Sequence, residues 1–240
     1  PSPSSPSLQS FTNAHIPRLP LGLARLRLAP EAQLTELGLA LLVGRLSSSL
    51  RLLDLSATGS AFSPDALALL SASVGLRELY LPPLVLGSDG TGANGFGLLD
   101  ALAPSLVVFS APCAGLAPDI LKSLGACTRL TRLVLGSPTT STPPPPHADL
   151  ASLVLPPSLV SITLCGWSDL EHGLVNALLT APNVGHLELV RCGFAAPNNS
   201  ATPPDSVNEL VPRSVPLTLA LVECSGELVL SSAIAHLRAV

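Results

Sequence analysis

Leu76-Arg77-Glu78-Leu79-Tyr80-Leu81 places three leucines in the spacing apolar-x-x-apolar-x-apolar. Seven further stretches repeat this spacing, so that eight copies are spread over the 240 residues. We call the middle apolar residue of each copy the central residue; it stands at positions 26, 53, 79, 109, 133, 162, 187 and 219. Neighbouring central residues are 24 to 32 positions apart, a repeat of roughly 27 residues. Self-similarity at such a period indicates a solenoid, in which each unit packs only against its neighbours.

Each copy of the spacing predicts one short strand. Alternate side chains of a strand point to opposite faces, so the three apolar residues face inward and the residues between them face outward. Turn residues and a segment with helical periodicity follow each copy. Stacking such units predicts an α/β fold, a curved solenoid with a parallel sheet on the concave face and short helices on the convex face.

Helices are expected at several places between the strands. Residues 31–47 place Leu34, Leu37, Leu41 and Leu42 at helical spacing. Ser63 is expected to cap the next helix, with Pro64 at its first position. Further helices are expected over 117–125, 168–182, 204–211 and 227–237.

The chain divides into a lead-in and an array. Residues 1–18 are rich in Ser and Pro without any period, which predicts a flexible segment. The array covers 19–240 with about eight repeats, and the loops 82–97, 136–146 and 195–204 lengthen three of them. Because the last residues begin another copy of the spacing, we expect an array truncated at its C-terminus.

Composition excludes several classes of function. The net charge is -4, and the densest basic pair is Arg25 and Arg27, so a nucleic-acid partner is not expected. The longest wholly apolar run, residues 37–44, is far shorter than the roughly 20 residues of a membrane-spanning helix, and no membrane insertion is expected. Leucine is the dominant residue, which supplies a large apolar core.

The five cysteines indicate a reducing compartment. Cys113, Cys127, Cys165, Cys192 and Cys224 are odd in number and widely spaced, unlike a disulfide framework or a zinc site. Reduced structural thiols favour a cytoplasmic or nuclear protein. The sequon at residues 198–200 is the observation that points toward secretion.

These repeats resemble the leucine-rich repeat family over residues 19–240, since their length lies in the 20–29 residue window and their spacing follows L-x-x-L-x-L-x-x-N/C. Cys192 and Cys224 occupy the N/C position, which is similar to the cysteine-containing subclass of F-box proteins. Thr58, Ala114 and Pro138 depart from that pattern.

The resemblance implies a horseshoe that binds a protein. It could recognise substrates for an F-box-type ubiquitin ligase, with the F-box before Pro1. A regulatory or scaffolding protein of the GTPase-activating or innate-sensor type is the alternative. A receptor ectodomain has less support, since neither a signal peptide nor disulfide caps are seen.

Outward positions of the strands are the candidate partner-binding residues. They stand one residue before, one after and three after each central residue, and stacking aligns them in columns on the concave face. The side chains that we expect to contact a protein partner are Arg25, Arg27, Asp54, Glu78, Tyr80, Arg132, His186 and Glu188. Trp167 is expected to pack in the core.

No enzymatic site is expected. The glycines at 90, 92 and 95 fit G-x-G-x-x-G, but the acidic residue of a dinucleotide site is not at its place. Asp169, Glu171 and His172 lack a further ligand at metal-binding spacing. We therefore expect no catalytic residue, no cofactor and no metal, and we do not expect a small-molecule ligand.

Overall fold

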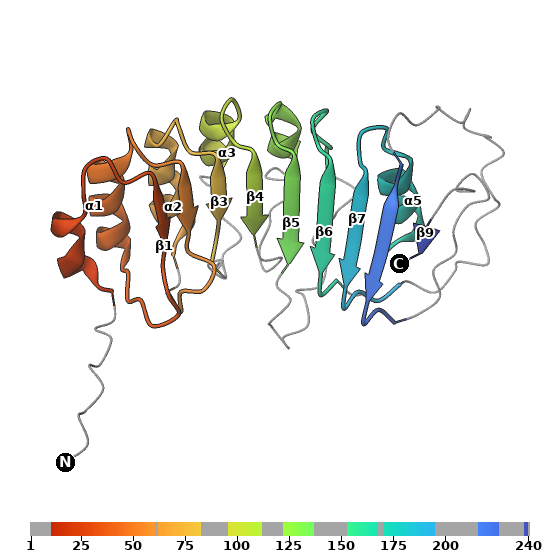
Figure 1. The fold of residues 1–240 in the computed structure, drawn as a ribbon, viewed down its shortest axis with the longest axis horizontal. Coiled ribbons are helices and arrows are strands. Elements are labelled where there is room, and N and C mark those ends of the chain that lie inside the picture. Colours follow the sequence, from red (N-terminus) through yellow and green to blue (C-terminus); the bar gives the residue numbers. More distant parts are fainter. Residues whose placement is uncertain are drawn as a thin grey trace, which may run out of the picture.

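The computed structural model describes residues 11–60, 62–82, 96–111, 122–136, 153–167, 170–194, 216–225 and 238–239. Within them, nine parallel strands form one sheet whose order follows the chain from β1 to β9 (Figure 1). The strands are β1 (Arg25–Arg27), β2 (Leu52–Asp54), β3 (Glu78–Tyr80), β4 (Val108–Ala111), β5 (Arg132–Gly136), β6 (Ser161–Cys165), β7 (His186–Val190), β8 (Thr218–Val222) and β9 (Arg238–Ala239). The predicted α/β fold with a parallel sheet is confirmed.

The register of the sheet follows the apolar spacing. From β1 to β8 every central residue pairs with the central residue of the next strand, as Leu53 does with Leu79 and Leu79 with Phe109. A slip by one residue would turn an inward leucine to the other face of the sheet. Burial of the leucines therefore fixes the alignment of the outward positions as well.

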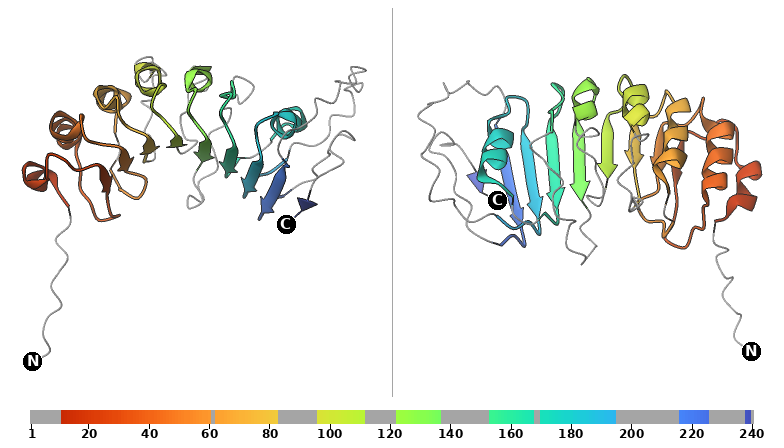
Figure 2. Two further views of the ribbon diagram at one scale, coloured as in Figure 1. Left: turned by 45° about the horizontal axis from the view of Figure 1, so that its top comes forward. Right: turned by 180° about the vertical axis from the view of Figure 1, so that it is seen from behind.

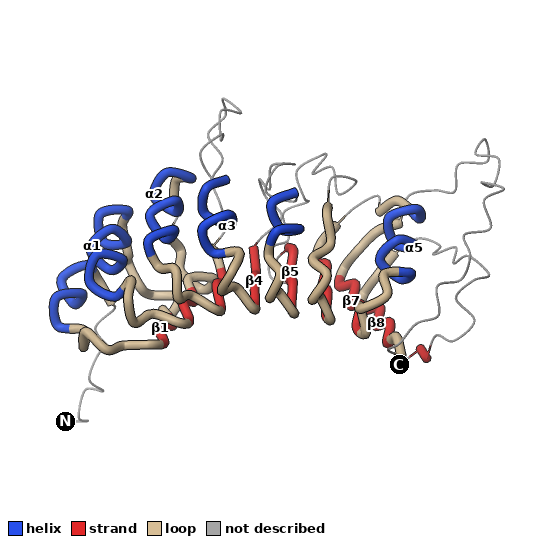
Figure 3. Tube along the Cα trace, turned by 90° about the horizontal axis from the view of Figure 1, so that it is seen from above, coloured by secondary structure: helices blue, strands red, loops and turns tan. Residues whose placement is uncertain are grey.

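The described helices lie on one side of the sheet. They are α1 (Glu36–Leu46), α2 (Pro64–Ala68), α3 (Phe96–Leu102) and α5 (His172–Thr180), with the 3-10 helices η2 (Leu69–Ala72) and η4 (Leu124–Ala126). Figures 2 and 3 show the molecule as an arc with helices on its outer side and strands on its inner side. A helix is about 10 Å wide and strands are about 4.8 Å apart, so the stack bends with the sheet on its concave side.

The first helix differs from the prediction. It begins at Glu36, where the Thr35 hydroxyl accepts a hydrogen bond from the Gly38 amide, and not at 31. Leu37 is 67% exposed and Leu41 is exposed too, although both were expected on the apolar face. Leu42 is buried as expected, and it forms the buried face with Leu39, Val43 and Leu46, at the i, i+3, i+4, i+7 spacing of one helical stripe.

Later helices agree with the sequence in part. Ser63 caps α2 by accepting from the Ala66 amide, and Pro64 stands in its first turn, as predicted. The helix α5 ends at Thr180, just before Pro182, but begins at His172 and not at 168. The expected helices over 204–211 and 227–237 lie outside the described residues, as does the start of the one expected over 117–125.

Part of the expected lead-in is folded. Asn13–Arg18 form a 3-10 helix, η1, and Ile16 within it is buried against the first repeat. The Asn13 amide donates to the Thr35 hydroxyl, and the Arg45 guanidinium donates twice to the Leu19 carbonyl. The prediction of a flexible segment is therefore wrong for residues 13–18, because Ile16 supplies an apolar contact that covers the open side of α1.

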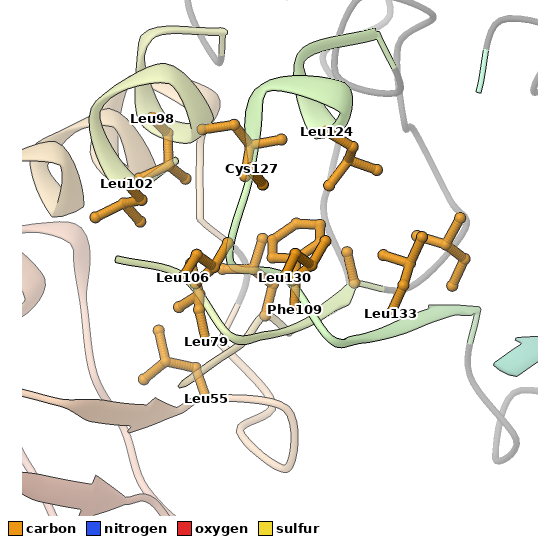
Figure 4. Packing of buried hydrophobic residues seen from close by; sticks show 14 of the residues in the cluster. Leu55, Leu79, Leu98, Leu102, Leu106, Phe109, Leu124, Cys127, Leu130 and Leu133 are labelled. Carbon is orange, nitrogen blue, oxygen red and sulfur yellow. The ribbon is translucent and has the colours of Figure 1, made fainter. Parts of the chain in front are cut away.

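One continuous apolar core runs between the helices and the sheet. Figure 4 shows Leu79 and Phe109, whose side chains rise from β3 and β4 toward Leu102 of α3 and Leu124 of η4. Phe109 is the single aromatic central residue, and it is as buried as the leucines beside it. Every repeat contributes to this core, so no repeat buries its apolar side chains alone.

Side-chain hydrogen bonds from serine hydroxyls, here called the hydroxyl ladder, join the repeats of β1 and β2, of β3 and β4, and of β5 and β6 at the start of the strands. In each case the donor hydroxyl belongs to the residue four positions before the central residue of its own repeat. The acceptor is the backbone carbonyl three positions before the central residue of the preceding repeat. Ser49 bonds to Leu23 at 3.1 Å, Ser105 to Leu76 at 2.7 Å and Ser158 to Leu130 at 2.8 Å. These hydroxyls satisfy carbonyls that lie outside the β-ladder.

A second ladder joins the repeats after the strands. The N/C position is the fifth residue after the central residue. Its side chain donates to the backbone carbonyl two positions after the central residue of the preceding repeat. Trp167 Nε1 reaches Leu135 at 3.3 Å, Cys192 Sγ reaches Leu164 at 3.4 Å and Cys224 Sγ reaches Leu189 at 3.2 Å. The residue before each of them has a positive φ: 73° at Gly166 and 52° at both Arg191 and Glu223. That left-handed turn directs the next side chain inward.

We predict that Ser105→Ala lowers the free energy of unfolding by about 1 kcal/mol, because the Leu76 carbonyl loses its hydroxyl partner. Urea denaturation measures the change. The matched control is Ser48→Ala at an exposed turn position, which should change the free energy of unfolding by less than about 0.5 kcal/mol. Equal effects of the two substitutions would contradict a structural role for the hydroxyl ladder.

Candidate functional site

The inner face of the sheet carries all eight side chains predicted to contact a partner. No described helix covers this face, as Figure 3 shows. The predicted residues form two groups: six lie on β1, β2, β3 and β5, and His186 and Glu188 lie on β7. We call the inner face of β1 to β5 the arginine face, since Arg25, Arg27 and Arg132 are its most exposed side chains.

An ion pair crosses the arginine face above a leucine. Arg25 Nη2 lies 3.7 Å from Glu78 Oε1, although β2 separates their strands. Leu52 of β2 stands between them in register and is 1% exposed. The alternation of the strand places Leu52 outward, so the aliphatic stems of Arg25 and Glu78 must close over it.

Cations lie above carboxylates on this face. The side chain of Arg25 is 70% exposed and that of Glu78 is 30% exposed. Arg27 Nε lies 4.0 Å from Asp54 Oδ2, and the corresponding exposed fractions are 66% and 22%. Such open pairs are worth about 0–1 kcal/mol each, so they orient the side chains more than they stabilise the fold.

Tyr80 links the parts of the arginine face. Burial of its phenol is the main reason that the pKa of Tyr80 is raised, and the carboxylate of Glu78 adds to this effect. The guanidinium groups of Arg132 and Arg27 oppose the shift. The ring from β3 thus lies within electrostatic range of cations on β5 and on β1.

The second group is smaller. The Thr163 hydroxyl of β6 donates to Glu188 Oε2 at 3.1 Å, and His186 stands two residues before Glu188 on the same strand. Thr163 and Cys165 are buried although their positions are outward ones. The carboxylate of Glu188 is thereby held in place on β7.

Sequence reasoning missed three exposed arginines beside the arginine face. Arg51 and Arg77 immediately precede β2 and β3, and Arg129 lies three residues before β5. They fall outside the outward columns, which is why the repeat pattern did not select them. A side chain at Gly75 would collide with the Arg51 guanidinium, so this glycine leaves the space that Arg51 occupies.

Trp167 is buried in the core, as predicted, and Cys127, Cys192 and Cys224 are free thiols. Burial raises the pKa of Cys127, Cys165 and Cys192 to about 11. Among the described residues, no three His, Cys, Asp or Glu side chains are grouped so as to hold a metal ion. The glycines at 90, 92 and 95 and Asp169 lie outside the described residues.

Two further findings concern membrane-spanning helices and similarity to known proteins. Its helices include none with the length and apolar character needed to cross a membrane. No protein-family model matches the sequence, and no curated protein matches it significantly.

We predict that iodoacetamide modifies Cys224 well before Cys127, Cys165 and Cys192 in the folded protein at mildly alkaline pH. Cys224 is half-buried, whereas the other three are buried and kept protonated by their raised pKa values. Peptide mass spectrometry measures the order. In urea the four should react at similar rates, and early modification of Cys192 in the native protein would contradict its placement.

Proposed function

We propose that the protein is a leucine-rich repeat horseshoe that binds a protein partner on its concave face. The observation that carries this proposal is the uncovered inner face, on which charged, aromatic and aliphatic side chains are aligned from β1 to β7. Arginine and tyrosine are enriched at the residues that dominate binding energy in protein interfaces. The strands beneath hold them rigidly, which lowers the entropic cost of binding.

Within this proposal, the repeats recognise the substrate of an F-box-type ubiquitin ligase. The thiols of Cys192 and Cys224 at the N/C position support that reading, because they make the same interrepeat hydrogen bond. A regulatory or scaffolding protein of the GTPase-activating or innate-sensor type is the alternative. The free thiols favour the cytoplasm or nucleus in either case.

We predict that the double substitution Arg132→Glu/Glu188→Arg weakens partner binding by at least about tenfold. It leaves the net charge unchanged but reverses the sign of the inner face at β5 and β7. A photo-crosslinking amino acid at Tyr80 should capture the partner in extract, and the double substitution should abolish that capture. The matched control carries the same amino acid at Leu37, on the outer side.

The melting temperature of the double variant should fall by about 2–4 °C, the shift that about 1 kcal/mol causes in a protein of this size, because Arg132 is exposed but half-buried Glu188 accepts a hydrogen bond from Thr163. Unchanged capture in a folded double variant, or equal capture from Leu37, would contradict concave-face binding. Sequencing the crosslinked partner distinguishes a ubiquitin-ligase substrate from a regulatory partner.

A further inference from the structure

We propose that the arginine face, together with the arginines that precede its strands, binds an acidic segment of a partner protein in extended conformation. This inference rests on the proposed function and names the chemistry of the partner. The expected ligand is a short peptide in which Asp or Glu residues alternate with apolar ones.

Charge on the described part of the N-terminal half is segregated between its two sides. The inner face and strand starts from β1 to β5 hold two carboxylates, Asp54 and Glu78, and six arginines: Arg25, Arg27, Arg51, Arg77, Arg129 and Arg132. The formal charge of this surface is +4, whereas the whole chain carries -4. The remaining described charged residues of this half lie outside the strands and sum to -1: the acids are Glu31, Glu36, Asp65 and Asp100, and the bases are Arg18, Arg45 and Lys122.

The arginines are available to a ligand. In the described part of the chain, the ion pairs on this surface involve only Arg25 and Arg27. Their carboxylates are the more buried partners, so an approaching ligand meets the guanidinium groups first. Arg132 is exposed, and so are the three arginines that precede the strands. Arg51 Nη1 donates to the Leu50 carbonyl at 3.4 Å, and an arriving carboxylate can accept hydrogen bonds from its other donors and from those of the remaining arginines.

Apolar surface lies between these cations. Tyr80, Val108 and Val134 are half-buried outward residues of β3, β4 and β5. Leu52 lies under the Arg25–Glu78 pair. Because an exposed pair of this kind is weak, Arg25 can turn to a ligand carboxylate and uncover Leu52. The surface therefore fits a segment with both acidic and apolar side chains, and not a uniform polyanion.

The dimensions suit a peptide. At about 4.8 Å between strands, β1 and β5 are about 19 Å apart, which an extended chain covers with about six residues. A long nucleic acid would meet the negative charge of the rest of the chain, and the described part of this surface has one aromatic ring, Tyr80, for base stacking. The observations thus favour a short protein segment over RNA or DNA.

Fluorescence anisotropy tests the proposal with the full chain. The probe is a fluorescein-labelled peptide about twelve residues long in which Asp and Glu alternate with Leu and Phe. A matched peptide carries Asn and Gln in place of the acids, and a short single-stranded oligonucleotide represents nucleic acid. We expect the acidic peptide to bind at least about tenfold more tightly than either, with an affinity that falls as salt rises.

Arg27→Glu/Arg132→Glu should weaken acidic-peptide binding by at least about tenfold. The matched control, Arg18→Glu/Lys122→Glu, changes the net charge equally but lies outside the arginine face and should bind like the wild type. Glu78→Gln should tighten binding about two- to fivefold, since it removes a competing carboxylate and frees Arg25. A gain of this kind cannot come from misfolding.

The proposal is overturned if the neutral peptide or the oligonucleotide binds as well as the acidic peptide, or if Glu78→Gln weakens binding in a protein with an unchanged melting curve. It is also overturned if the acidic peptide does not bind at all. Capture of a partner from Tyr80 in extract would then still support concave-face binding, so the two proposals fail separately.

Discussion

The rest of the structure depends on the pairing of one central residue with the next along the whole sheet. Strands of two to five residues cannot bury an apolar face alone, and here each is completed by its neighbours in the sheet. The core forms only when Leu26, Leu53, Leu79 and the later central residues stand in one row. Side-chain hydroxyls hold the starts of β2, β4 and β6 to the preceding repeat, and side chains at the N/C position hold the ends of β6, β7 and β8, so burial and hydrogen bonding favour the same register.

This register also creates the inner face. Because outward side chains stand about 4.8 Å from their counterparts on the next strand, a long side chain can reach across a whole strand. Arg25 does so when it meets Glu78 above Leu52. Charges that are far apart in sequence therefore act as one group, and the field at Tyr80 includes cations from β1 and β5. A repeat of about 27 residues thus becomes a surface whose chemistry varies along the array.

The sequence predicted the strands well and the side-chain arrangement less well. The spacing around Leu79 identified each strand and its inward face, since alternation leaves few choices. It failed for Leu37 and Leu41, because nearly every position of α1 is apolar and several helical stripes were possible. Leu52 was expected on an accessible column, but its burial depends on Arg25 and Glu78 from neighbouring repeats. The role of Arg51 depends on space left by Gly75, which the repeat consensus does not contain.

Arginine suits an inner face that both covers an apolar residue and presents hydrogen-bond donors to a ligand. A guanidinium on a long stem can cover an apolar residue such as Leu52 and still present several donors to solvent. Its pairing with Glu78 keeps the stem in place without binding it strongly, because the pair is open to water. A ligand carboxylate then exchanges one weak ion pair for another and gains the apolar contact beneath. In the proposed complex, Leu52 and Tyr80 contribute apolar contact, and the arginines contribute both affinity and selection for acidic segments.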